Sequence, residues 1–256
     1  MQNFAENYTQ KKYAPLFIIT EWYDFDGDVI ALPDLTTYTH NRVGVLIGDT
    51  EQRTVGTPSK GAATGLLGGR LSKIGVHQNP GKPIDGPVSA DKVYIVDEQA
   101  EDFDVEALHD KGYMTFTTHT NKSGYYFTHG ILATGIKDDY RHITRRRTID
   151  KVYRIVYDVL VDELLKEVPV TRQGTISPVY AKTLEGQIMN RIYNQMTANN
   201  ELSFDQSDKN DKGCIAKVNT EKNFLASGTL EVTVGAKPYG YNDLINVKLG
   251  YNTTKN

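Results

Sequence analysis

The sequence contains one cysteine, one tryptophan and no long apolar run. Its only thiol, Cys214, excludes an intrachain disulfide framework and a cysteine-rich metal site. The longest apolar runs, such as residues 16–19, are too short to cross a bilayer. The polar segment 1–12 lacks the apolar stretch of a secretion signal. We therefore expect no secretion signal and no membrane insertion.

An excess of positive charge is also absent. Lys and Arg number 29 against 32 Asp and Glu, which gives a formal net charge of −3 at pH 7. Proteins that hold nucleic acid by bulk charge are basic, so we expect no direct nucleic-acid partner. Hydrophobic residues make up 39% and charged residues 24% of the chain, an ordinary globular composition.

The motifs of common enzyme classes are missing as well. No Gly-x-Ser-x-Gly occurs, and the glycine-rich segment 61–69 continues into Arg70 and Leu71 where a phosphate-binding loop needs Lys and then Ser or Thr. The six histidines have no spacing typical of metal ligands. We therefore expect no enzymatic activity, no metal and no cofactor.

One acidic segment leaves an alternative open. Asp24, Asp26 and Asp28 resemble the first half of a calcium loop, but Gly27 stands at position four and Leu35 at position twelve, where an EF-hand needs Gly at six and Glu at twelve. A solvated acidic turn is the preferred interpretation. The alternative is a metal- or phosphate-ligand-dependent hydrolase that combines this turn with the glycine-rich helix.

What the chain does have is tyrosine, 16 residues against 8 Phe. A tyrosine side chain has an apolar ring and a polar hydroxyl, so it suits interfaces as well as cores. With no catalytic constellation found, this composition favours a protein that binds other proteins, including copies of itself.

Apolar periodicity predicts four helices, two of them long. The segment 60–75 is rich in glycine, and each helical glycine costs about 1 kcal/mol relative to alanine, so we expect another backbone to approach it closely. A short acidic helix is expected over 101–110. The long helices are expected over 148–168, with Thr148 as N-cap, and over 178–199.

Short β-rich runs predict strands between and after these helices. Strands and helices alternate early and strands cluster late, which indicates a fold between α/β and α+β, with mixed sheets and two long helices. We divide the chain into a central α/β region, 1–135, and a C-terminal domain, 136–256. The expected strands are 16–20, 42–49, 92–96, 113–117, 124–127, 214–219, 229–236 and 244–249.

The dense basic cluster Arg145-Arg146-Arg147 precedes the expected helix 148–168. Three interpretations stay open at this point. The arginines could be solvated or paired with carboxylates in a loop, they could bind a small anion at the helix N-terminus, or they could form ion pairs at an interface.

The segment 138–154, DDYRHITRRRTIDKVYR, resembles the contractile-tail sheath proteins of bacteriophages, in which such a segment opens a long helix. Three more segments resemble that family in the same order: the small-residue helix 61–71, the strand pair 111–127 with its KGY and GYYF, and the ending 238–251. The resemblance covers residues 15–251. Family members are usually longer, so this chain resembles their central and C-terminal portion.

The resemblance implies a mechanical function and a sheath-core-like fold. Sheath subunits form hexameric rings that stack helically around a tail tube, bounded by baseplate and tail terminator proteins. Contraction drives the tube through the host envelope, and the genome follows. The energy comes from new contacts between subunits, not from nucleotide hydrolysis. The expected location is the virion tail, assembled in the bacterial host cytoplasm.

The resemblance also implies roles for particular residues. Arg145, Arg146, Asp150 and Lys151 match the family segment and are candidates for structural or inter-subunit ion pairs. Leu244, Ile245, Val247 and Leu249 are candidates for strand exchange with a neighbour, since extended ends of sheath subunits add strands to neighbouring sheets. The polar start, Met1 to Lys12, is expected to be an arm or a loose end.

Overall fold

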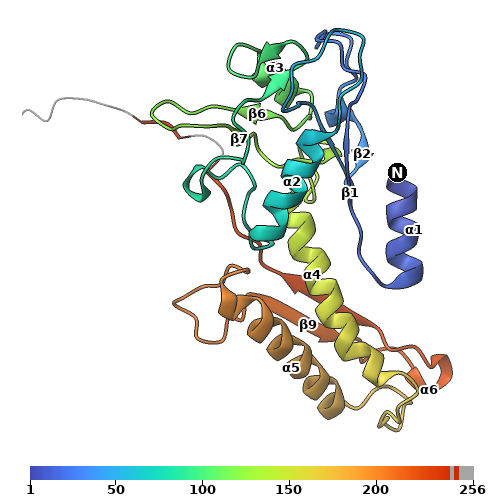
Figure 1. Ribbon diagram of the computed structural model, residues 1–256. Helices are drawn as coiled ribbons and strands as arrows, with labels where there is room; N and C mark the ends of the chain where they lie inside the picture. The colour runs from blue at the N-terminus through green and yellow to red at the C-terminus, as the bar shows by residue number, and fades with distance from the viewer. Residues whose placement is uncertain (243–244, 248–256) are drawn as a thin grey trace, which may run out of the picture.

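The computed structural model describes residues 1–242 and 245–247. Buried apolar side chains form two clusters, one within residues 25–143 and one within 152–218. The long helix α4 (Ile143–Leu160) contributes Ile143 to the first cluster and Val152 and Ile155 to the second, so it joins the two halves of the molecule (Figure 1). None of the described helices is long and apolar enough to cross a membrane.

The N-terminal half combines short strands with helices, of which α2 (Ala62–Lys73) is the longest. Strands β1 (Ile18–Glu21) and β3 (Val43–Leu46) pair in parallel, and α2 packs against β1. The other elements of this half are α1 (Gln2–Lys12), η1 (Leu35–Thr37), β2 (Thr39–His40), η2 (Pro83–Asp85), β4 (Tyr94–Ile95), β5 (Glu98–Gln99), α3 (Val105–Asp110), β6 (Phe116–Thr117), β7 (Tyr126–Phe127) and β8 (Ala133–Thr134).

The C-terminal half places helices α4 and α5 (Pro178–Gln195) side by side, with α5 packed against strand β9 (Cys214–Val218). β9 pairs antiparallel with β10 (Val232–Ala236). Ala216 and Val218 of β9 are buried, whereas Ile215 between them is exposed, so one face of this two-stranded sheet is solvated. The short elements are η3 (Val161–Glu163), η4 (Thr197–Asn199) and α6 (Phe224–Ser227).

The expected fold class is confirmed: the chain has mixed α and β structure, small sheets and two long helices. Helix 178–199 corresponds to α5 followed by η4, and helix 60–75 corresponds to α2. The predicted strands at 113–117 and 124–127 shorten to β6 and β7, which pair with each other.

The polar start is not a loose end. Residues 2–12 form helix α1, because Gln2, Ala5 and Thr9 recur at helical spacing and are buried against the body of the chain. The Gln2 side chain accepts a hydrogen bond from the Arg42 backbone N–H at 2.9 Å, and Thr9 Oγ1 accepts one from the Leu16 N–H at 3.2 Å. The expectation of an arm is therefore wrong for the described chain.

The first long helix begins five residues earlier than Thr148. Thr148 is buried inside α4 and is not its N-cap. The helix extends back to Ile143 because that side chain is fully buried in the first cluster. Arg145, Arg146 and Arg147 consequently lie within the helix and not in a loop before it.

The glycines of α2 do not serve close packing within the chain. A Cβ atom placed on Gly65, Gly68 or Gly69 would have no other atom within 4 Å, apart from its own chain neighbours and helix backbone. All three residues are exposed. The expectation that another backbone approaches this face is therefore wrong for the isolated chain.

Only part of the last expected strand, 244–249, belongs to the described chain. Leu244 and Leu249 lie outside the described residues. Ile245 and Val247 are 75% and 70% exposed, and residues 245–247 are in no strand.

Candidate assembly surfaces

Helix α4 is held to the N-terminal half by a buried cluster of three charged side chains. The two terminal guanidinium nitrogens of Arg42 donate to the Asp150 carboxylate, with Nη1–Oδ2 at 3.2 Å and Nη2–Oδ1 at 3.3 Å. Arg146, one turn before Asp150, reaches Oδ1 at 2.9 Å. Its guanidinium also lies 4.3 Å from the ring centroid of Tyr140. Asp150 therefore pairs with two cations, one from α4 itself and one from the N-terminal half.

Arg147 joins the same helix to the end of α2. Its guanidinium donates to the backbone carbonyls of Leu71 at 2.8 Å, Ile74 at 3.1 Å and Gly75 at 3.2 Å. These acceptors lie at the C-terminal end of α2, where carbonyls lack helical partners and a cation is favoured. Burial lowers the pKa of Arg147, so these hydrogen bonds offset a desolvation cost.

The four candidate ion-pair residues are not equivalent. Arg146 and Asp150 pair with each other, and Lys151 pairs with Glu201 beyond η4. Arg145 makes no ion pair in the described chain, and its Nε is buried without a hydrogen-bond partner. A terminal nitrogen of Arg146 is directed at Asp150 and those of Arg147 at backbone carbonyls, whereas Arg146 Nε is buried without a hydrogen-bond partner. Arg42 belongs to the cluster, but nothing near it in the sequence indicates this.

The sheet β9–β10 has two unpaired edges in the described chain. The Asn219 N–H donates to the Glu231 carbonyl, and the Lys237 N–H donates to the Gly213 carbonyl. In this register the odd-numbered residues of the two strands exchange backbone hydrogen bonds with each other. The N–H and C=O groups of Val232, Val234 and Ala236 therefore point outward, away from β9. This outer edge of β10 is a template for another strand.

The outer edge of β9 faces a groove of about 630 Å³ beside α5. The Glu185 carboxylate accepts a hydrogen bond at 3.0 Å from the Val218 N–H, which points away from β10. It also forms an ion pair with Lys182 at 2.7 Å. These bonds lower the pKa of Glu185, against an opposing effect of burial. A side chain thus satisfies one edge position of β9, whereas the described chain leaves the β10 edge open.

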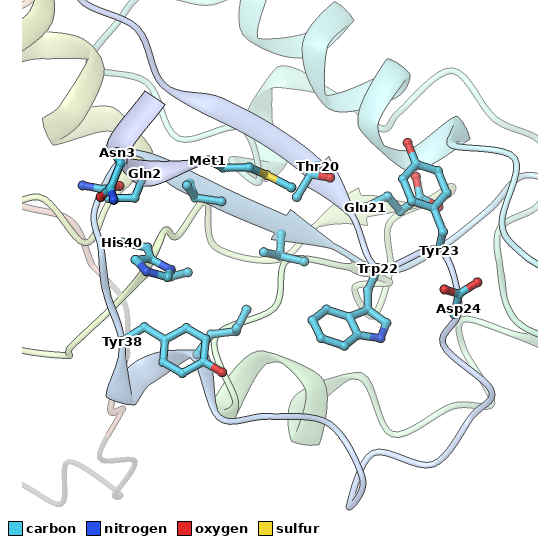
Figure 2. Close-up of a pocket in the computed structure, with 14 residues that line it drawn as sticks. Met1, Gln2, Asn3, Thr20, Glu21, Trp22, Tyr23, Asp24, Tyr38 and His40 are labelled. Carbon is cyan, nitrogen blue, oxygen red and sulfur yellow. The ribbon is translucent and has the colours of Figure 1, made fainter. Parts of the chain in front are cut away.

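A cavity of about 660 Å³ lies between the first turn of α1 and strands β1 and β3 (Figure 2). Its lining includes Val43 and Val45 of β3 together with the aromatic rings of Trp22 and Tyr38. Its buried carboxylate, Glu21, accepts hydrogen bonds from outside the cavity, and burial raises its pKa. The lining includes the carboxylates of Glu21 and Asp24 and the imidazole of His40, but no hydrogen bond or ion pair joins His40 to either carboxylate in the described chain.

The Ser59 hydroxyl lies between two buried carboxylates, those of Glu21 and Asp49. One hydroxyl proton serves only one of them. Ser59 donates to Glu21, and Asp49 Oδ2, 3.1 Å from the same hydroxyl, also accepts the Lys60 backbone N–H at 2.9 Å. This cluster holds the loop before α2 against β1.

The acidic turn is a structural turn. Asp26 accepts the N–H of Asp28, and Asp28 accepts the N–H groups of Ile30 and Ala31. Among the described residues no group of three or more His, Cys, Asp or Glu side chains could hold a metal ion.

The only cysteine is not placed for catalysis. Burial raises the pKa of the Cys214 thiol to about 11, and its Sγ donates to the Met189 carbonyl at 3.7 Å. A thiol with such a pKa carries little thiolate at neutral pH, so it is a poor nucleophile.

The fold brings together an aromatic cluster that the sequence spacing does not indicate. The rings of His129 and His142 lie 4.5 Å apart between centroids, and Tyr241 lies within 6.5 Å of both. The Tyr241 hydroxyl donates to the His77 carbonyl at 2.6 Å. These contacts hold Tyr241 against the N-terminal half.

Comparison with solved structures identifies the fold. A chain in the cryo-EM structure of the anti-feeding prophage (AFP) baseplate, 6-fold symmetrised, aligns with 98% of this chain at a TM-score of 0.67 and 16% identity. A chain of the PVC sheath complex of an extracellular contractile injection system, in the contracted state, aligns with 93% at 0.62 and 12%. A chain of the AFP baseplate in the contracted state aligns with 98% at 0.63 and 13%. The protein spans 63%, 64% and 65% of the length of these three chains, respectively.

No curated protein matches the sequence. Two family models do match, and together they extend over nearly the whole chain. The model described as DUF2586, N-terminal domain, matches residues 1–131, and DUF2586, C-terminal domain, matches residues 139–256. The chain therefore belongs to the DUF2586 family.

Proposed function

We propose that this protein is a structural subunit of a contractile sheath, which polymerises around a tail tube and contracts to drive that tube through a host envelope. The fold supports a place in this class, because it is shared with chains of a contractile injection system sheath and of a related baseplate. The role is structural and not catalytic.

The observation that carries the proposal is the open edge of β10. A two-stranded sheet is marginal alone, and an unpaired edge next to a packed helix pair accepts a strand from another chain. The donor we propose is the segment of a neighbour that contains Leu244, Ile245, Val247 and Leu249. The exposure of Ile245 and Val247 supports this choice.

In this proposal the subunits form hexameric rings that stack helically around the tube. Further partners are baseplate and tail terminator proteins. The regions 1–135 and 136–256 would act as two domains, a division supported by the separate matches to 1–131 and 139–256. The location would be a phage tail or a phage-like injection particle, and genome ejection applies to a phage tail. Arg146, Asp150 and Lys151 would stiffen each subunit, which leaves Arg145 for contacts between subunits.

Two single proline substitutions in β10 test the proposal. The Val234 N–H points outward, so Val234→Pro removes a donor for an incoming strand and spares the pairing with β9. Assembly, measured by sedimentation, should be lost while the melting temperature changes little. The matched control, Thr233→Pro, removes a bond to β9 instead and should lower the melting temperature. Unchanged assembly of a folded Val234→Pro protein would contradict strand addition at this edge.

A further inference from the structure

The turn after α4 presents two leucines to solvent at the end of the C-terminal half. Leu164 is 71% exposed and Leu165 is fully exposed, and Val161 lies beside them, partly exposed. Leu165 has a φ of 61°, in the left-handed region that side chains other than Gly, Asn and Asp rarely adopt. The chain thus holds an apolar side chain outward in an unfavourable backbone conformation.

Hydrogen bonds fix this turn. The Glu163 carboxylate accepts from Lys166 Nζ at 2.8 Å and from the Tyr180 hydroxyl of α5. The Leu164 N–H donates to the Val161 carbonyl at 3.2 Å. These bonds lower the pKa of Glu163 against the opposing effect of burial and raise that of Tyr180, where burial acts in the same direction. We call Val161, Leu164 and Leu165 the apolar knob.

Acidic residues flank the apolar knob in the sequence. Residues 158–167 contain four carboxylates and one lysine, and that lysine pairs with Glu163. Asp158, Asp162 and Glu167 are exposed and make no ion pair in the described chain. A complementary surface therefore combines apolar side chains with positive charge.

One flank of helix α1 has this combination. Phe4 and Tyr8 are exposed, and their ring centroids lie 6.1 Å apart on one side of the helix. Lys11 and Lys12 follow Tyr8 by three and four residues, so they extend the same side. Neither lysine makes an ion pair in the described chain.

We propose that the apolar knob of one copy docks on the Phe4–Tyr8 flank of α1 in a second copy, with Asp162 and Glu167 facing Lys11 and Lys12. The two surfaces are different and lie on separate elements, α1 in the N-terminal half and the α4–α5 turn at the far end of the C-terminal half (Figure 1). Such a contact is head-to-tail and propagates from copy to copy. The inference rests on the proposed function, because it adds a second contact to the polymer.

Cysteine cross-linking tests this contact directly. In a Cys214→Ala background, a Tyr8→Cys chain is mixed with a Leu165→Cys chain and oxidised mildly under assembly conditions. A cross-linked dimer of the mixed chains is expected, and roughly tenfold less with Gln187→Cys, an exposed control on α5, in place of Leu165→Cys. Equal cross-linking of both mixtures, or none in either, overturns the proposal.

Charge reversal gives an independent measurement. Lys11→Glu with Lys12→Glu should raise the concentration needed for assembly by roughly tenfold, and Asp162→Lys with Glu167→Lys in the same chain should restore it. No effect of either pair, or no restoration, overturns the knob contact. Failure of the unaltered chain to assemble overturns the proposed function itself, whereas assembly without the Tyr8–Leu165 cross-link overturns only this inference.

Discussion

Arg42 and Asp150 are separated by 108 residues in the sequence and form a two-point ion pair, with distances of 3.2 Å and 3.3 Å. Arg42 immediately precedes β3, and Asp150 lies near the middle of α4. The pair therefore attaches α4, which joins the two apolar clusters, to the start of β3 in the N-terminal half.

Replacing Asp150 by Asn should strongly destabilise the fold. The change leaves Arg42 and Arg146 buried without a carboxylate, and loss of one partner of a buried pair costs about 3–5 kcal/mol. Chemical denaturation measures the free energy of unfolding. Asp158→Asn, on the exposed side of the same helix, should change it by less than about 0.5 kcal/mol. Equal effects of the two substitutions would show that the cluster does not stabilise the attachment of α4.

Replacing Arg147 by Met should detach the end of α2 from α4. Three carbonyls lose a charged donor, and we expect a loss of about 2–3 kcal/mol. Arg147→Lys keeps the positive charge but lacks the planar set of guanidinium donors. Its free energy of unfolding should therefore lie between those of Arg147→Met and the original protein. The exposed Arg191→Met on α5 is the control. Hydrogen exchange should quicken in residues 70–75, and protection there equal to that of the original protein would contradict the account.

Alanine at the open glycines of α2 should stabilise the chain. No atom outside the helix obstructs a Cβ at Gly65, Gly68 or Gly69, and each substitution should add about 1 kcal/mol through helix propensity. The control is Gly112→Ala, where φ is +89° and the new Cβ would lie 3.0 Å from that of Leu35. Gly112→Ala should lower the melting temperature. A higher melting temperature for Gly112→Ala would contradict the argument that its positive φ requires glycine.

The stability contribution of Glu21 should depend on pH with a defined sign. Burial raises its pKa above the ordinary value of 4.5, so the unfolded chain loses this proton at lower pH than the folded chain. Stability therefore falls as pH rises from 4.5 through the folded pKa. Glu21→Gln mimics the protonated form, so its stability relative to the original protein should increase across this window. The exposed Glu106→Gln should show no such increase.

The sequence predicted elements whose contacts are local and repeated. Leu184, Ile188 and Ile192 of α5 and its C-cap residue Met196 recur every four residues, and all four are buried. The start of α4 was not predicted, because a run of arginines is typical of a solvated loop. Arg146 pairs with Asp150 one turn later in α4, and Asp150 in turn pairs with the distant Arg42. The partners of Arg147 are carbonyls at the end of α2.

Features of the candidate surfaces depended still more on tertiary structure. The sequence indicated strands at 214–219 and 229–236, but which of their edges is open depends on the pairing register and on Glu185. The helix α1 was missed because its mean polarity is high and only three of its residues are buried. The exposure of Leu165 follows from a left-handed backbone that no local signal marks.

Electron microscopy of the concentrated protein tests the central claim most directly. The account predicts rings or tubes with sixfold symmetry in which β10 of one subunit carries an added strand from another, and their absence with Val234→Pro. A chain that stays monomeric at high concentration, or polymers in which the β10 edge is left unpaired, would contradict it.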